Sequence, residues 1–150
     1  MHRRTFLMTA AAVPAGLLSL RPALAAEPPV YAEGGVAIDG TDPVAYFTDG
    51  GPVAGDPAIF SDWNGARMLF SSSENKAMFD ADPDAFAPQF GGYCAFAVSE
   101  GYVASTVPEA WTIHEGRLYL NYSRSVRRRW LRDIDDRIAR ANANWPGVSA

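Results

Sequence analysis

Cys94 is the only cysteine in the chain, and it lies in the segment Gly91-Gly92-Tyr93-Cys94-Ala95-Phe96. A single cysteine cannot close an internal disulfide. A thiol can bind a soft metal ion, can act as a nucleophile once its pKa is lowered, or can pack as a small apolar side chain. These three roles define the functional alternatives for the protein.

Three other side chains beyond residue 25 carry soft or borderline metal ligands: His114, Met68 and Met78. One thiol, one imidazole and one thioether suit copper, because sulfur ligands select copper(I) and imidazole binds copper well. We therefore predict Cys94, His114 and Met68 as candidate metal ligands, with copper as the favoured ion. Considered singly, Met68 on a strand and Met78 on a helix have the simpler role of filling the core.

Two alternatives need no metal. A pocket lined by aromatic side chains around Tyr46 and Tyr93 would make the protein a small-molecule or partner-binding module. A thiol-dependent enzyme would pair Cys94 with His114, so that the imidazole lowers the thiol pKa. The sequence contains no nucleophile elbow, phosphate loop or zinc-protease helix motif, so binding is favoured over catalysis.

The first 25 residues have the three zones of an export signal. Arg3 and Arg4 precede an apolar stretch at 9–20, and Ala23-Leu24-Ala25 supplies the small residues that a signal peptidase requires. The apolar stretch is too short for a permanent membrane span. The Arg-Arg-x-Phe-Leu order resembles a twin-arginine signal, with a general secretory signal as the alternative. We predict a cleaved signal peptide over 1–25 and a periplasmic protein that is not integral to the membrane.

Charge is unevenly distributed along the chain, whose formal net charge is −4. Between Glu27 and Glu115 the only basic residues are Arg67 and Lys76, whereas eight arginines follow from Arg117 onward. The acidic body argues against nucleic-acid binding. The arginine-rich C-terminal helix is a candidate surface for a protein partner, although a solvated helix face also accounts for such charge.

The elements that must position these residues start with a short strand predicted at 36–38 and a hairpin. Apolar runs at 59–63 and 67–70 flank Asn64-Gly65, a dipeptide that favours a tight turn. A capping box at 71–74 then predicts the start of a helix. The inward-facing residues of this helix are expected to be Ala77, Met78 and Phe79.

A second hairpin is predicted at 111–114 and 117–120, and the apolar run at 93–98 fits either a buried strand or a buried helix. Residues 26–35 are expected to form a tether, and 36–148 a single domain. Strands followed by segregated helices indicate an α+β fold. A long amphipathic C-terminal helix is predicted from apolar positions that repeat at spacings of four and three: Val126, Trp130, Ile134, Ile138 and Ala141.

Several of these segments together resemble the YHS domain, a small metal-associated module. They are Asp42-Pro43-Val44, the Trp63-Asn64-Gly65 hairpin, and Phe70-Ser71-Ser72 at the start of a helix that carries Phe79 and Asp82-Pro83. The chain further resembles an exported bacterial branch of that family, in which four segments recur: 42–47, 87–95, 118–122 and 144–146. The resemblance implies a YHS-type scaffold with a role in binding.

The sequence departs from the metal-associated form of the module at its cysteine positions. Those positions hold Ala45, Ser71 and Asn75 here. Serine and asparagine are poor ligands for copper(I) or zinc, and alanine is none. The resemblance therefore implies a scaffold without its usual metal ligands, in which Ser71 caps a helix. Copper handling would then depend on Cys94.

Overall fold

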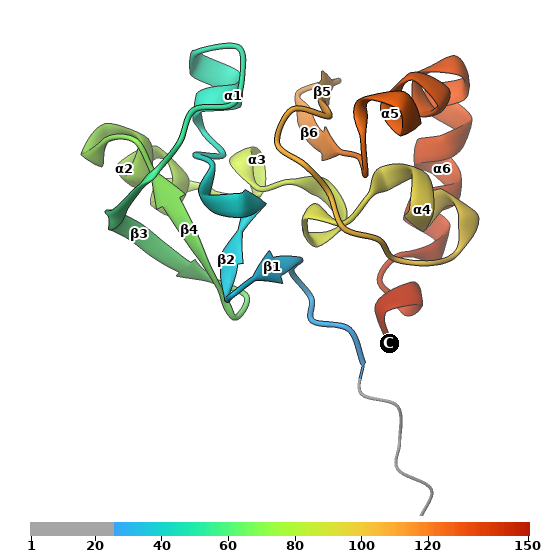
Figure 1. Cartoon of the computed structure of the whole chain (residues 1–150), viewed down its shortest axis with the longest axis horizontal. Coiled ribbons are helices and arrows are strands. Elements are labelled where there is room, and N and C mark those ends of the chain that lie inside the picture. The colour runs from blue at the N-terminus through green and yellow to red at the C-terminus, as the bar shows by residue number, and fades with distance from the viewer. Residues whose placement is uncertain (1–25) are drawn as a thin grey trace, which may run out of the picture.

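A four-stranded sheet lies on one side of the molecule, with its strands in the order β1-β2-β4-β3 (Figure 1). The computed structural model describes residues 26–150, so the predicted signal peptide lies outside the described residues. The strands are β1 (Ala32–Glu33), β2 (Val36–Ala37), β3 (Asp56–Trp63) and β4 (Ala66–Phe70). Asn64 and Gly65 both have positive φ in the β3–β4 turn, which confirms the predicted hairpin.

Three short helices follow: α1 (Ala45–Thr48), α2 (Ser73–Ala81) and α3 (Pro83–Phe86). Of these, α2 packs against β3 and β4, and α1 and α3 contribute side chains to the same core. The side-chain oxygen of Ser72 accepts a hydrogen bond from the Asn75 backbone N–H at 3.1 Å, so Ser72 caps α2 and the expected cap, Ser71, does not. Phe79 is buried as predicted, whereas Met78 is 42% exposed and Ala77 is also exposed. Only one narrow face of α2 meets the sheet, so Met78 is not a core residue.

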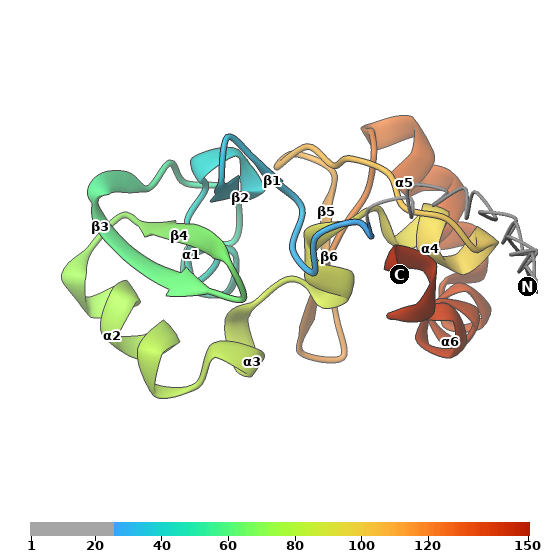
Figure 2. The ribbon, with the colours of Figure 1, turned by 90° about the horizontal axis from the view of Figure 1, so that it is seen from below.

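The second hairpin, β5 (Trp111–His114) and β6 (Arg117–Leu120), lies between the sheet and three helices (Figures 1 and 2). Because side chains alternate along a strand, β6 serves two cores. Leu118 and Leu120 pack into the first core with Met68, and Tyr119 packs into the second core with Trp130. Met68 is fully buried, which agrees with its predicted role as a core filler.

The three helices beyond this hairpin are α4 (Ala95–Glu100), α5 (Arg124–Trp130) and α6 (Ile134–Asn144). The apolar run at 93–98 is therefore largely helical, and Gly101 ends α4 with a φ of 94°. All five apolar positions predicted for the C-terminal helix belong to the second core. That helix is divided into α5 and α6 by the short 3₁₀ turn Leu131–Asp133. Other 3₁₀ turns lie at Ile38–Gly40, Gln89–Gly92 and Gly147–Ser149. These elements confirm the α+β fold class.

The segment expected to be a tether is packed against the domain from Pro28 onward. Val30 is buried in the first core. The Tyr31 N–H donates a hydrogen bond to the Gly91 carbonyl at 2.9 Å, and the Tyr93 hydroxyl donates one to the Pro28 carbonyl at 2.8 Å. Within residues 26–150, none of the helices has the combination of length and apolar character that a membrane span requires.

Asp42 is a buried side chain that connects three parts of the sheet side. One carboxyl oxygen accepts a hydrogen bond from the Val44 N–H at 2.9 Å and a longer one from the Ala45 N–H. The other oxygen accepts bonds from the Ser71 N–H and hydroxyl at 2.8 and 2.7 Å, and from the Asn75 side-chain amide at 2.8 Å. The start of α1, the end of β4 and the first turn of α2 are thereby held together.

We predict that Asp42→Ala lowers the free energy of unfolding by about 3 kcal/mol or more, because it leaves two buried backbone N–H groups and three partly buried donors without their acceptor. Asp80→Ala is the matched control: Asp80 forms an exposed ion pair with Lys76, and its loss is expected to cost less than about 1 kcal/mol. Urea unfolding followed by tryptophan fluorescence measures both. Equal costs for the two variants would contradict a structural role for Asp42.

Candidate functional site

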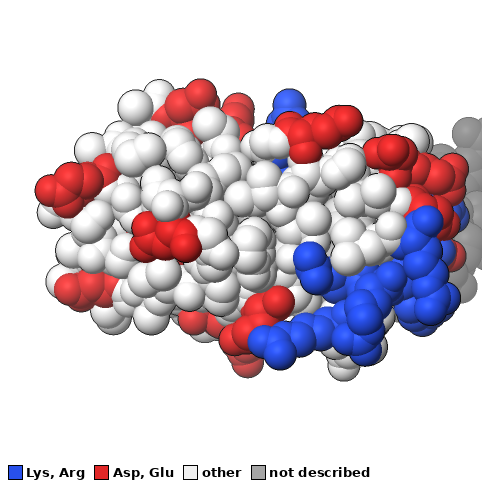
Figure 3. Space-filling view, turned by 90° about the horizontal axis from the view of Figure 1, so that it is seen from above, with Lys and Arg blue, Asp and Glu red and all other residues white. Residues whose placement is uncertain are grey.

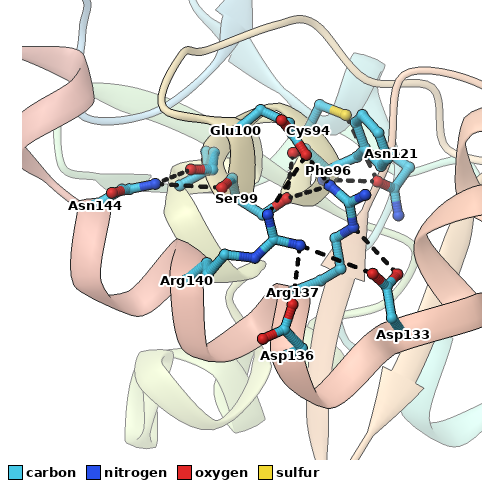
Figure 4. A network of polar contacts seen from close by, with 11 residues as sticks. Cys94, Phe96, Ser99, Glu100, Asn121, Asp133, Asp136, Arg137, Arg140 and Asn144 are labelled. Atoms are coloured by element: carbon cyan, nitrogen blue, oxygen red, sulfur yellow. Dashed lines mark hydrogen bonds and ion pairs between the residues drawn. The ribbon is translucent and has the colours of Figure 1, made fainter.

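Cys94 lies directly before α4, and its side chain is only 1% exposed. Its sulfur accepts a hydrogen bond from the Tyr122 N–H at 3.2 Å, and the thiol donates to Asn121 Oδ1 at 3.5 Å. Asn121 Oδ1 also accepts a bond from the Phe96 N–H at 3.0 Å (Figure 4). The start of α4 is therefore fixed to the residues that follow β6.

Burial raises the pKa of the Cys94 thiol, and the backbone N–H groups around the sulfur offset only part of that effect. The side chain is therefore a neutral thiol at pH 7. Because the thiolate is the reactive form, this environment does not activate Cys94 as a nucleophile. The candidate base, His114, instead has its Nε2 3.0 Å from Asp135 Oδ1 on α6.

A pocket of about 260 Å³ opens beside the Cys94 sulfur. Its walls are mostly apolar, and its two tyrosines, Tyr102 and Tyr122, are more than half exposed, at 52% and 55%. Arg129 contributes the one charged side chain of the lining, and its guanidinium carbon lies 4.8 Å from the centre of the Phe96 ring. The full lining is Cys94, Phe96, Ala97, Tyr102, Ala104, Tyr122, Val126 and Arg129.

Basic side chains gather around α5, at one end of the face shown in Figure 3. We call the four exposed members the arginine surface: Arg124, Arg128, Arg129 and Arg132. Across residues 26–150, none of these four forms an ion pair. Arg137 and Arg140 on α6 differ, because they pair with Glu100 and with nearby aspartates (Figure 4). The arginine surface therefore keeps its positive charge uncompensated next to the pocket.

The structure places the three predicted metal ligands in different surroundings. Met68 belongs to the first core and Cys94 to the second. The His114 ligand atom groups with those of Glu115 and Asp135, all within 4.8 Å of one another. Within the described chain, neither the pocket lining nor the hydrogen bonds of Cys94 include a second sulfur or an imidazole. Copper binding through Cys94 stays a prediction from the sequence.

The structure does not bring Tyr46 and Tyr93 together to line a pocket, and neither lines the pocket beside Cys94. The Tyr46 hydroxyl donates to the Pro108 carbonyl at 2.9 Å, and the two tyrosines belong to different cores. The pocket residues Tyr102, Ala104 and Arg129 were not predicted as site residues. Arg129 follows Val126 by three positions, which places both on one helix face, and this spacing was a usable signal. The other two lie in a loop without periodicity.

Iodoacetamide is expected to alkylate Cys94 at pH 7 more than about tenfold more slowly in the folded protein than in the urea-unfolded chain, because the thiol is buried and neutral. His114→Ala should leave the rate unchanged, since His114 does not contact the sulfur. Mass spectrometry of the labelled protein gives the rates. Rapid labelling of the folded protein that slows in His114→Ala would favour the enzyme hypothesis.

The raised thiol pKa also predicts a loss of stability at alkaline pH. Above the ordinary thiol pKa of about 8.5 the unfolded chain loses a proton that the folded protein keeps, so stability falls as pH rises. Burial also raises the pKa values of four tyrosines, Tyr31, Tyr46, Tyr93 and Tyr119. These add a similar decline in the wild type and in Cys94→Ala. The difference between the two proteins therefore isolates the cysteine contribution. Urea unfolding between about pH 8.5 and 9.5 should show a steeper decline for the wild type than for Cys94→Ala. If the free energy of unfolding falls equally steeply with pH in both proteins, the pKa of the Cys94 thiol is not raised by folding.

Comparison with known proteins finds no matching family, no similar curated protein and no similar solved structure. Any function must therefore be argued from the geometry of the chain itself. That geometry consists of a buried neutral thiol, an apolar pocket beside it, and an uncompensated arginine surface at the pocket.

Proposed function

We propose that the protein is a binding module whose pocket beside Cys94 holds a small ligand with an apolar body and an anionic group. The observation that carries this proposal is the combination of apolar walls with a single charged lining residue, Arg129. Apolar burial would supply most of the affinity, and the guanidinium would fix the orientation of a carboxylate. Among the described residues, the Cys94 sulfur contacts an amide oxygen and a backbone N–H but no base that would activate it, which favours binding over catalysis.

The size of the pocket limits the ligand. Its volume of about 260 Å³ lies just below the usual range of small-molecule sites, about 300–1,000 Å³. A single aromatic ring or a short acyl chain would fill it. The exposed rings of Tyr102 and Tyr122 would then lose contact with water on binding.

The arginine surface supports an anionic ligand. Its four side chains form no ion pairs in the part of the chain that the structure describes, so no carboxylate of the protein competes for them. Uncompensated positive charge around a pocket raises the local concentration of anions. An acidic protein segment would be attracted by the same charge, and a protein partner at this surface is the alternative to a small ligand.

We also propose that the scaffold is of the YHS type and works in the periplasm after export. The support for the scaffold is the position of Ala45, Ser71 and Asn75, which all donate hydrogen bonds to Asp42. Positions that hold cysteines in the metal-associated module thus converge on one point. A hydrogen-bonded carboxyl group occupies that point in place of a metal site.

The test uses benzoate and hexanoate as probes, each with its neutral alcohol, benzyl alcohol or hexanol, for comparison. Calorimetry on the protein from residue 26 onward should show binding of at least one acid and weaker binding of its alcohol. Arg129→Ala should weaken acid binding about tenfold or more, because a charge-assisted hydrogen bond is lost. Arg128→Ala is the matched control, since Arg128 lies on the same helix outside the pocket lining.

Three outcomes would overturn the proposal: no binding of either acid, equal binding of acid and alcohol, or equal weakening by Arg128→Ala and Arg129→Ala. A titration with copper(I) under anaerobic conditions distinguishes the metal hypothesis from the small-ligand proposal. Copper binding by the wild type that is lost in Cys94→Ser would replace the ligand pocket with copper handling as the function.

A further inference from the structure

A second cavity, of about 520 Å³, lies between the sheet side and the end of α6, and it shares no lining residue with the Cys94 pocket. We call it the central groove. Segments far apart in the sequence form it: the β3–β4 turn, the turn after α3, the start of β6 and the end of α6. Its principal side chains are Trp63, Asn64, Gln89, Arg117, Asn142 and Trp145.

The polar side chains of the central groove are mostly amides. Asn64, Gln89 and Asn142 each offer a carbonyl acceptor and an NH₂ donor. Throughout residues 26–150, these three side chains form no hydrogen bond with the protein, so their donors and acceptors are available to a ligand. The two charged lining residues, Asp84 and Arg117, have opposite signs. The groove therefore has no net charge.

Two indole rings add apolar surface to this polar groove. Trp63 and Trp145 are both half-buried, so part of each ring faces the cavity. The ring of Trp63 packs edge-on against Phe79, with the ring centres 6.4 Å apart. Trp145 packs against Phe90 and Tyr93 at 6.1 and 6.0 Å. Both rings are held in place before any ligand binds.

The backbone of one groove wall is also fixed. Phe90 has a φ of 56°, an uncommon conformation for a residue other than glycine. The next residue, Gly91, packs so tightly against the N-terminal segment that a Cβ there would lie 2.0 Å from the Pro29 carbonyl oxygen. Pro29 itself lines the groove. The N-terminal segment thus locks this wall into one shape.

We propose that the central groove binds a short neutral oligosaccharide. Sugar hydroxyls both donate and accept hydrogen bonds, which matches the amides of Asn64, Gln89 and Asn142. The apolar faces of sugar rings can pack on the two indoles. A purely apolar ligand would desolvate the amides without replacing their hydrogen bonds. Because Asp84 and Arg117 have opposite signs, a charged ligand would be attracted by one and repelled by the other, so the groove has no net preference for either charge.

The test follows tryptophan fluorescence while cellotriose, maltotriose and chitotriose are added separately to the protein from residue 26 onward. At least one should shift the emission, because Trp63 and Trp145 line the groove. Asn142→Ala and Gln89→Ala should each weaken binding about three- to tenfold, the effect of one lost neutral hydrogen bond. Neither side chain forms a hydrogen bond with the rest of the described protein, so both variants should fold normally. Tyr102→Ala, in the Cys94 pocket, is the control and should leave sugar binding unchanged.

The proposal is overturned if none of the three trisaccharides shifts the fluorescence, or if the shift survives unchanged in the Asn142→Ala, Gln89→Ala double variant. A shift with trialanine in place of the sugars would reassign the groove to peptides and would also overturn it. This inference does not rest on the anionic ligand of the Cys94 pocket. If the Asn142→Ala, Gln89→Ala double variant loses sugar binding but still binds benzoate, the central groove and the Cys94 pocket are independent sites.

Discussion

The structure depends on strand β6, which joins two cores that would otherwise be separate. Leu118 and Leu120 point into the core beneath the sheet, and Tyr119 points into the core of the helices. The strand also connects the two cavities, because Arg117 at its start lines the central groove and Tyr122, just beyond its end, lines the Cys94 pocket. A shift of one residue in its register would exchange the two faces and disrupt both cores.

Asn121 extends this constraint to the candidate site. It is fully buried, and its Oδ1 receives hydrogen bonds from both the Cys94 thiol and the Phe96 N–H. Its backbone N–H donates to the Ala110 carbonyl at 3.0 Å, which fixes the loop before β5 as well. Cys94 is therefore placed by a neutral amide and a backbone N–H. Neither partner stabilises a thiolate as an imidazolium would, so the sulfur behaves as a small polarisable wall of the pocket.

Local sequence signals predicted much of the fold but not the site. Asn64-Gly65 and Glu115-Gly116 specify tight turns, and the spacing of Trp130 and Ile134 specifies a helix. The helix at 95–100 was undecided, since a short apolar run fits either state. The spacing of Val126 and Arg129 indicated a shared helix face, but the pocket as a whole could not be predicted, because Tyr102, Tyr122 and Arg129 come from three separate segments. Their meeting depends on long-range packing, and so does the separation of Met68 from Cys94.

Electrostatics favours an anionic ligand over copper as the proposed occupant of the Cys94 pocket. A copper ion would require the thiolate, and burial of the sulfur disfavours that form by raising the pKa of the thiol. A metal cation would in addition be repelled by the arginine surface. An anionic ligand meets the opposite conditions: it is attracted by Arg129, and its own charge would raise the thiol pKa further and keep the sulfur neutral. The buried thiol and the uncompensated arginines therefore favour the same occupant.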